Sequence, residues 1–144
     1  LLVLSSAWSG LYRGKVVCAL GNLFIPMLAE GQVHGGVAQG IGQALMEHVV
    51  FDDDGQLLTA TFMDYAMPRA SDVPMIGFAT EAVPSTANIM GMKGCGEAGT
   101  VGAMAAAANA VQDALWEAGV RQADMPFTPH RVWQMLNEAK HTAG

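Results

Sequence analysis

Apolar residues recur at every fourth position of residues 33–49, the spacing that places side chains on one face of an α-helix. This stripe consists of Val33, Val37, Ile41, Leu45 and Val49. A second face of the same predicted helix carries Gly36, Gln39, Gly40, Gln43 and Glu47. Each glycine within a helix costs about 0.5–1 kcal/mol relative to alanine. The pattern therefore indicates close approach, either of a ligand or of another helix.

Beyond this helix the pattern changes to short extended segments. Three Asp residues and a Gly at positions 52–55 separate segments rich in Val, Leu and Thr, which predicts a hairpin turn. The alternative is a calcium site, although such a tip is more often a solvated turn. Residues 75–83 are predicted to form a strand. Residues 84–99 are predicted to form a loop because they are dense in Gly, Pro, Ser and Asn.

Two further helices are predicted in the last third of the chain. The first begins at Thr100, an N-cap candidate, and stops at Gly119. Its apolar face comprises Val101, Met104, Ala108, Val111 and Leu115. The second begins with Thr128 and Pro129, and its apolar face comprises Val132, Met135, Leu136 and Ala139. Residues 1–20 have no clear period. The predicted helices together with the short extended segments indicate the α+β fold class, with helices packed on a small mixed or antiparallel sheet.

The composition bears on how much of the surface is covered by other protein. Of the 144 residues, 51% are hydrophobic and 14% are charged, with a formal net charge of −6. So few charges indicate a surface that other protein covers, and the alternative is a large core in a lone domain. Only seven Lys and Arg residues argue against a nucleic-acid partner, because nucleic acid is bound mainly through its phosphates.

Cysteine usage and the longest apolar runs indicate the compartment. Two cysteines, Cys18 and Cys95, cannot form a disulfide scaffold, and ten Met residues suit a reducing compartment. No run reaches the roughly 18 apolar residues of a membrane span, and the first residues lack the basic flank of a secretory signal. We therefore expect no membrane partner and a cytoplasmic location. The start at Leu1 rather than Met suggests a fragment or a processed product.

Residues 91–100 form the segment with the strongest candidate chemistry. Glycines 91, 94, 96 and 99 allow the backbone to approach a ligand, and the segment ends where a helix begins. Free N–H groups at that helix end favour anions such as phosphates or oxo groups. The carboxylate of Glu97 lies among these glycines and is a candidate catalytic group. The alternative is a first-turn glutamate that only stabilises the helix dipole.

Two other interpretations of the same loop stay open. Residues 94–99 satisfy the dinucleotide pattern G-x-G-x-x-G, which needs a preceding strand and an acidic residue ending the next strand. Residues 88–91 make a poor strand, and the acidic residues about twenty positions on lie inside the predicted helix. Cys95 is a candidate nucleophile, or simply a small residue that fills a tight loop. No His or Cys cluster has the spacing of a zinc site.

Four segments together resemble a known family. They are Gly-Gln-Val-His-Gly-Gly-Val-Ala-Gln-Gly-Ile-Gly-Gln-Ala-Leu at 31–45, Phe-Met-Asp-Tyr-Ala-Met-Pro at 62–68, Lys-Gly-Cys-Gly-Glu at 93–97 and Met-Pro-Phe-Thr-Pro at 125–129. Their order resembles the C-terminal part of the molybdenum-binding large subunit of the xanthine dehydrogenase, aldehyde oxidase and aerobic carbon monoxide dehydrogenase family. The resemblance implies that residues 21–144 are the C-terminal portion of a molybdopterin-binding domain, after an atypical segment at residues 1–20.

The resemblance also implies a role for individual residues. Glu97 corresponds to the general base, which takes a proton from a water-derived hydroxyl at the molybdenum before its oxygen attacks an electron-poor carbon. The implied cofactor-binding residues are Gly35, Gly36, Gln39, Gly40, Lys93, Gly94, Cys95 and Gly96. No protein side chain is expected to ligate the metal. The Glu-Ala-Gly that begins at Glu97 is similar to the bacterial branch that uses molybdopterin cytosine dinucleotide.

The implied activity is oxidation of an aldehyde or N-heterocycle by a molybdenum-dependent oxidoreductase. The implied partners are the rest of the molybdenum subunit and separate iron–sulfur and flavin subunits, in an oligomer. We expect this chain alone to be inactive, because the family's large subunit is several times longer. The alternative is a non-catalytic truncated remnant that acts only in folding or oligomerisation. The pattern departs from the family before Met27 and at residues 88–91, where Asn-Ile-Met-Gly replaces Asn-Pro-Leu-Gly.

Overall fold

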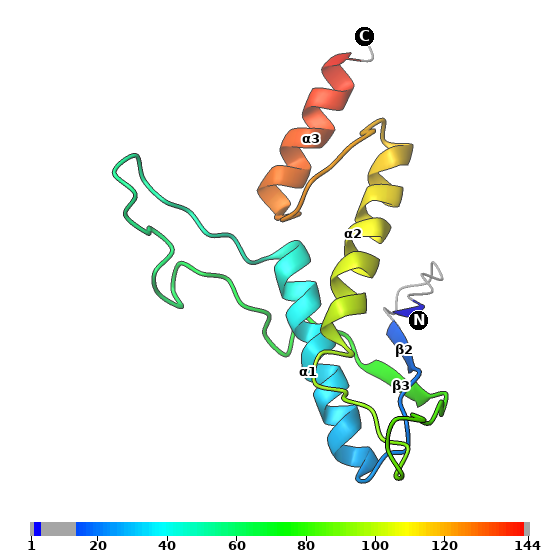
Figure 1. Ribbon diagram of the computed structural model, residues 1–144. Coiled ribbons are helices and arrows are strands. Elements are labelled where there is room, and N and C mark those ends of the chain that lie inside the picture. Colours follow the sequence, from blue (N-terminus) through cyan, green and yellow to red (C-terminus); the bar gives the residue numbers. More distant parts are fainter. Residues whose placement is uncertain (1, 4–13, 143–144) are drawn as a thin grey trace.

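A small sheet and three helices make up the computed structural model, which describes residues 2–3 and 14–142 (Figure 1). The strands are β1 (Leu2–Val3), β2 (Gly14–Cys18) and β3 (Ile76–Thr80), and the helices are α1 (Pro26–Leu45), α2 (Thr100–Glu117) and α3 (Pro129–Thr142). The sheet order is β1-β2-β3, with β1 antiparallel and β3 parallel to β2. The predicted α+β class with a small mixed sheet is confirmed.

Strand β2 lies at the centre of the sheet, although its sequence shows no clear period. Val16 pairs with Phe78 and Cys18 pairs with Thr80. Beyond the strand ends, Glu81 N donates to Cys18 O at 2.9 Å and Val83 N donates to Leu20 O at 2.9 Å. The strand predicted at residues 75–83 is therefore confirmed, and its hydrogen bonding to the segment after β2 continues to residue 83.

The main core lies between the sheet and the α1–α2 pair. Its buried members are Val16, Cys18, Leu20, Ala29, Val33, Val37 and Ala103. Three of these precede residue 21, so residues 14–20 contribute to the same core as α1. The boundary predicted between residues 20 and 21 itself stays a prediction.

Helix α1 differs from its prediction at both ends. It begins at Pro26, because proline is favoured at the first helical position, and it ends at Leu45. The prediction that the helix continues to Val49 is wrong, since Val49 lies in the following loop and is exposed. The buried residues of α1 include Val33 and Val37 from the predicted stripe but also Gly36, Gly40 and Gly42.

Residues 46–67 form an arm that extends away from the body, and the chain returns to α1 at Pro68, which lies against Gly42 (Figure 1). The predicted turn is present: Phe51 and Leu57 form an antiparallel bridge, and Gly55 has a positive φ of 81°. The Asp52 carboxylate accepts the backbone N–H groups of residues 54 and 56 at 3.0 and 2.8 Å. Tyr65 donates its hydroxyl to the Glu47 carboxylate, which ties the arm to the end of α1.

The start of α2 also differs from its prediction. Gly99 is the N-cap and Thr100 is the first helical residue, so the prediction of Thr100 as N-cap is wrong. The buried side chains of α2 are Ala103, Ala107 and Leu115, whereas Val101 is exposed. Alanines therefore form the packed face because α1 approaches α2 closely there. Gly119 terminates the helix as predicted, with a φ of 93°.

Helix α3 begins as predicted, after a linker that is fixed at several points. Thr128 Oγ1 accepts the N–H of Arg131 at 3.4 Å, the bond expected of an N-cap. Buried Phe127 donates its N–H to Ala44 O at 2.7 Å, which attaches the linker to the last turn of α1. Within residues 2–3 and 14–142, no helix combines the length and apolar character that crossing a membrane requires.

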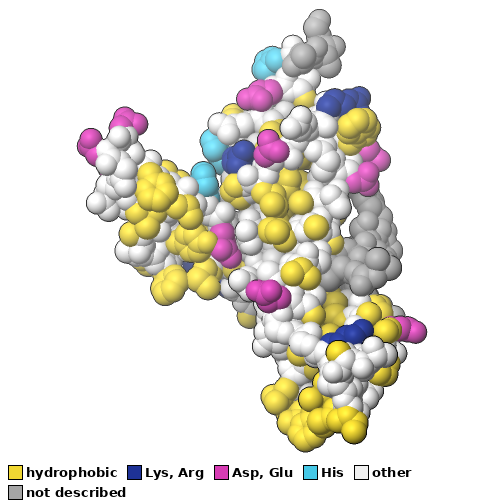
Figure 2. Space-filling view, viewed as in Figure 1, with side chains coloured by type: hydrophobic (Ala, Val, Ile, Leu, Met, Phe, Trp, Pro, Cys, Tyr) yellow, Lys and Arg dark blue, Asp and Glu magenta, His cyan; other side chains and the backbone are white. Residues whose placement is uncertain are grey.

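Apolar side chains gather on the surface in two places, on the arm and at the end of the body opposite α3 (Figure 2). On the arm, Phe62 and Met63 are 84% and 94% exposed. At the other end, Phe24 and Met27 near the start of α1 are exposed, as is Ile89 in the loop after β3. Exposed patches of this kind mark surfaces that contact other protein.

Candidate functional site

The glycine-rich loop at residues 91–99 is attached at its base to the segment after β2. Gly91, whose φ is 64°, accepts the backbone N–H groups of Asn22 and Ser85 at 3.0 Å each. The Asn22 side chain also donates to Met90 O at 2.8 Å. Asn88 closes the preceding turn through two hydrogen bonds to the Met92 backbone, at 2.9 and 3.0 Å. These bonds fix where the loop starts.

Two side-chain hydrogen bonds connect the other end of the loop to α1. Gln32 Nε2 donates to Gly96 O at 2.7 Å. The Thr100 hydroxyl donates to Gly36 O at 3.1 Å and lies 3.3 Å from Gln39 Oε1. Glu97 therefore lies between two points at which the chain is bonded to the same helix.

Glycines allow the loop and the start of α2 to come this close to α1. A Cβ atom on Gly36 would lie 3.0 Å from Thr100 N, and one on Gly40 would lie 2.8 Å from Met104 N. A Cβ atom on Gly99 would lie 2.9 Å from Val37 N. Real Cβ atoms rarely approach other atoms so closely, so helix α2 packs directly against the glycine face of α1 at Gly36 and Gly40. This is one of the two alternatives that the sequence left open.

The Glu97 carboxylate points to the exterior of the chain. The side chain is exposed, and it has no hydrogen-bond or ion-pair partner among residues 14–142. Its backbone carbonyl accepts the N–H of Val101 at 3.2 Å, which places Glu97 at the start of α2. The side chain is therefore held at a defined place and is free to contact a group from outside the chain.

The predicted cofactor-binding residues divide into open and packed positions. Ideal Cβ atoms on Gly35, Gly94 and Gly96 would meet nothing within 4 Å, and Gln39 and Lys93 are exposed. Gly36 and Gly40 are buried against α2, and Cys95 is half-buried against the core. The structure thus brings residues of α1 and residues of the loop together at one surface.

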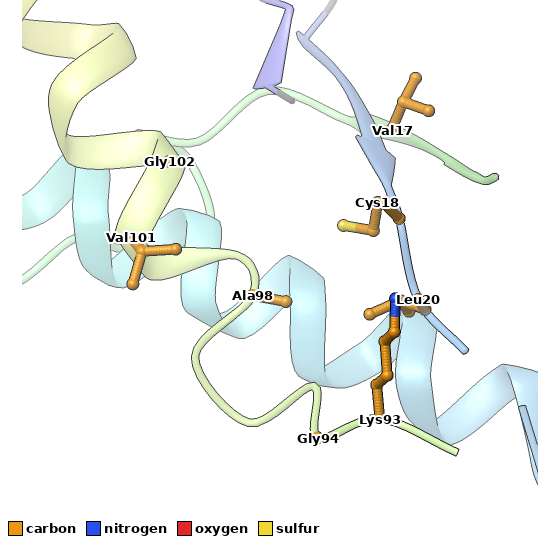
Figure 3. Close-up of a pocket in the computed structure, with 9 residues that line it drawn as sticks. Val17, Cys18, Leu20, Lys93, Gly94, Ala98, Val101 and Gly102 are labelled. Carbon is orange, nitrogen blue, oxygen red and sulfur yellow. The ribbon is translucent and has the colours of Figure 1, made fainter. Parts of the chain in front are cut away.

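An open, largely apolar cavity of about 310 Å³ lies beside this loop (Figure 3). Its lining residues are Val17, Cys18, Ala19, Leu20, Lys93, Gly94, Ala98, Val101 and Gly102. The Lys93 side chain extends from the loop toward Leu20, and Cys18 points from β2 toward the α2 side. Burial raises the pKa of the Cys18 thiol above its ordinary value. Glu97 is not among the lining residues.

The local geometry also bears on the dinucleotide interpretation of the loop and on metal binding by side chains. Gly94 follows a loop rather than a strand, so residues 94–99 are not the strand-to-helix turn of a dinucleotide fold. Among the residues that the structure describes, no group of three or more His, Cys, Asp and Glu side chains is placed to hold a metal ion.

Sequence reasoning gave no separate role to Gln32. Gln32 lies seven residues before Gln39, which is two helical turns along the same face of α1. Gln32 contacts Gly96 in the loop, and Gln39 contacts Thr100 at the start of α2. That helical spacing is the only sequence signal for the pairing. The partner itself, Gly96, lies 64 residues away in the chain.

Comparisons with known proteins give one consistent family. The family model described as molybdopterin cofactor-binding domain matches residues 11–74, which begins ahead of the boundary predicted at residue 21. Among curated proteins, the chain is 40% identical over 124 residues to the 6-hydroxypseudooxynicotine dehydrogenase complex subunit gamma of Paenarthrobacter nicotinovorans. It is 39% identical over 118 residues to the carbon monoxide dehydrogenase large chain of Hydrogenophaga pseudoflava.

These alignments cover most of this chain and a small part of each relative. The two alignments span 83% and 82% of this chain but only 16% and 15% of the relatives. Among solved structures, quinoline 2-oxidoreductase from Pseudomonas putida 86 superposes with a TM-score of 0.80 and 42% identity. That superposition covers 88% of this chain and 16% of the other.

Proposed function

This chain belongs to the family of molybdenum-binding large subunits of xanthine dehydrogenases, aldehyde oxidoreductases and carbon monoxide dehydrogenases, and on this premise we propose that Glu97 is a general base. The proposed enzyme is a molybdenum-dependent oxidoreductase that oxidises an aldehyde or an N-heterocycle with a water-derived oxygen. One observation carries the proposal: α1 holds the chain on both sides of Glu97 while the carboxylate itself stays unpaired and exposed.

The residues around Glu97 fit a molybdopterin cofactor. Open backbone at Gly35, Gly94 and Gly96 leaves room for a bulky group, and the exposed Lys93 suits its phosphates. The first turn of α2 contains no acidic residue and no side-chain cap, so its N–H groups favour an anion. We propose that Gln39, Cys95 and these residues contact the cofactor. Gly36 and Gly40 would contribute indirectly, by bringing α2 close to α1.

The division of chemistry between cofactor and protein follows from the side chains present. When bound, the molybdenum cofactor would supply the two-electron redox chemistry of the reaction. Glu97 accepts, on a carboxylate oxygen, the proton of the water-derived hydroxyl whose oxygen attacks the substrate. The carboxylate suits this step because no cation of the described residues pairs with it.

Further parts of the proposal concern what this chain does not contain. The chain spans about one sixth of the relatives it matches, so the rest of the molybdenum subunit must complete the pocket. The names of the relatives identify them as subunits or chains of larger complexes. We propose iron–sulfur and flavin partner subunits in an oligomer, the cytosine dinucleotide form of the cofactor, and a cytoplasmic location.

Replacement of Glu97 by Gln in the complete enzyme tests the proposed base. The amide keeps the size of the side chain but does not accept the proton, so kcat should fall by about 10²–10⁴-fold while molybdenum content stays unchanged. The matched control is Glu117→Gln, an exposed glutamate at the far end of α2, which should keep full turnover. Turnover that survives in Glu97→Gln removes Glu97 from the mechanism.

The second candidate function is a non-catalytic remnant that serves only in folding or oligomerisation. The exposed apolar arm favours this candidate, because such surfaces contact other protein whether or not catalysis occurs. Molybdenum and cytosine nucleotide content of the purified complex separates the two candidates. A complex that assembles but contains neither supports the remnant.

A further inference from the structure

We propose that Gln32 is a positioning residue that fixes the direction of the Glu97 carboxylate, an inference that rests on the proposed role of Glu97. Gln32 Nε2 donates to Gly96 O at 2.7 Å, the carbonyl of the peptide bond that leads directly into Glu97. The bond joins residues 64 apart, so it is a tertiary contact rather than a local turn. The side chain of α1 thereby sets the orientation of that peptide.

The other side of Glu97 is held by a different set of contacts to the same helix. The Thr100 hydroxyl bonds Gly36 O at 3.1 Å, and the Gly99 backbone packs against residues 33–37 of α1. Only Glu97 and Ala98 lie between these contacts and Gly96. With both ends fixed, the backbone of Glu97 is held, so the point from which its side chain extends and the direction of its Cα–Cβ bond are defined.

Gln32 supplies the side-chain hydrogen bond at a point where the loop has no side chains of its own to pack. Cys95 packs against the core and the Ala98 N–H donates to Cys95 O at 3.2 Å, but ideal Cβ atoms on Gly94 and Gly96 would meet nothing within 4 Å. Glycine also has more accessible backbone conformations than any other residue. Without the Gln32 bond, the peptide before Glu97 can rotate, and the carboxylate moves with it.

A glutamine suits this role because its amide is a neutral donor. Lysine or arginine at the same place would also donate to a carbonyl, but each would bring a positive charge near the carboxylate. A nearby cation favours the ionised form of a carboxylate and makes it a weaker base. The neutral amide therefore orients the loop without adding a charge to it.

The test compares Gln32→Met with Gln134→Met in the complete enzyme. Both glutamines are exposed and helical, and the Gln134 side chain on α3 makes no hydrogen bond to the residues that the structure describes, so Gln134→Met is the matched control. Methionine keeps the length of the side chain, favours helix and removes the donor. The two readouts are deuterium exchange of the amides at residues 96–101, measured by mass spectrometry, and steady-state kinetics.

In Gln32→Met we expect amide exchange at residues 96–101 to rise by about tenfold, the upper range for the loss of one hydrogen bond. We expect kcat to fall by about 10–100-fold, because small displacements of a reacting group are costly, while KM changes by less than about threefold. Molybdenum content should stay at the wild-type level. The control should change neither exchange nor kcat.

The outcomes separate this inference from the proposed base. Unchanged exchange or unchanged kcat in Gln32→Met overturns the positioning role, even when Glu97→Gln abolishes turnover. A lower kcat without faster exchange also overturns it, because Gln32 would then act by direct contact with the reactants. Active Glu97→Gln enzyme instead overturns the proposed function, whatever the exchange of residues 96–101.

Discussion

At the scale of the residue, Cys18 has an acid–base behaviour that its surroundings explain. The side chain is 6% exposed in the core, and burial raises the pKa of its thiol because the thiolate loses its hydration. After burial, the half-buried Cys95 raises this pKa further when it is a thiolate. At neutral pH Cys18 is therefore a protonated apolar residue rather than a nucleophile.

The shifted thiol makes stability depend on pH in a defined direction. The folded-state pKa lies above the unfolded one, so the stabilisation is fully present at neutral pH and is lost as pH rises through the thiol range. We predict that the stability difference between the wild-type chain and Cys18→Ala shrinks between pH 7 and pH 10. Urea unfolding of both proteins at pH 7 and at pH 10 measures the difference in the free energy of unfolding. The comparison with Cys18→Ala cancels other groups that titrate in this range, Tyr65 among them.

At the scale of the element, close packing of α1 on α2 determines where the loop lies. Helices approach this closely when small residues face each other, as Gly36, Gly40 and Ala103 do here. The short approach also brings the Thr100 hydroxyl within hydrogen-bond distance of the α1 backbone. Larger side chains on this face would separate the helices and move the loop.

Gly40→Ala tests this packing, with Gly31→Ala as its control. A Cβ atom on Gly40 would lie 2.7 Å from the Ala103 Cβ, so we predict a loss of about 1–3 kcal/mol in the free energy of unfolding. A Cβ atom on Gly31 meets nothing within 4 Å, so that variant should gain about 0.5–1 kcal/mol from helix propensity. Urea unfolding of the two variants checks both values. Equal stability of the two variants contradicts the packing explanation.

The elements that the sequence predicts well are those whose signals are local. The turn at residues 52–55, the Thr128 cap and the stop at Gly119 depend on residues within a few positions. Strand β2 was not predicted, because its pairing with β3 joins residues about 60 positions apart. The start of α1 at Pro26 was not predicted, because the glycines at 31, 35 and 36 interrupt the apolar period.

The candidate site was predictable to a similar degree. Glycine and glutamate in one loop indicated Glu97, and the family pattern indicated the α1 glycines. The hydrogen bond from Gln32 was not predictable, since no sequence rule pairs a helix glutamine with a carbonyl 64 residues later. The exposure of Glu97 was not predictable either, because the surroundings of a loop depend on tertiary packing.

At the scale of the whole molecule, exposed apolar surface is the main feature. Phe51, Phe62 and Met63 on the arm are 59%, 84% and 94% exposed, which is unusual for a domain that functions alone. The chain covers 16% and 15% of the first two relatives it matches, so in those proteins it corresponds to one part of a longer chain. The arm is therefore best explained as a contact surface.

We predict that this chain, when produced alone, associates through the arm. Replacement of Phe51, Phe62 and Met63 by Ser should weaken association by about tenfold or more, because each buried side chain of this size contributes about 1.5–3 kcal/mol. Replacement of the same three residues by Leu is the control and should keep it. Sedimentation equilibrium over a range of concentrations measures the change. Association that is equally strong in the Ser variant places the contact elsewhere.

The long sequence separation between α1 and the glycine loop determines when the site can form during synthesis of the chain. Every side-chain bond that holds Glu97 in place joins residues 61 to 64 positions apart, so the geometry cannot exist in a short excised peptide. During synthesis, α1 leaves the ribosome long before its partners do. The geometry around Glu97 therefore forms only after residue 100 has been synthesised, and a chain truncated before that residue never acquires it.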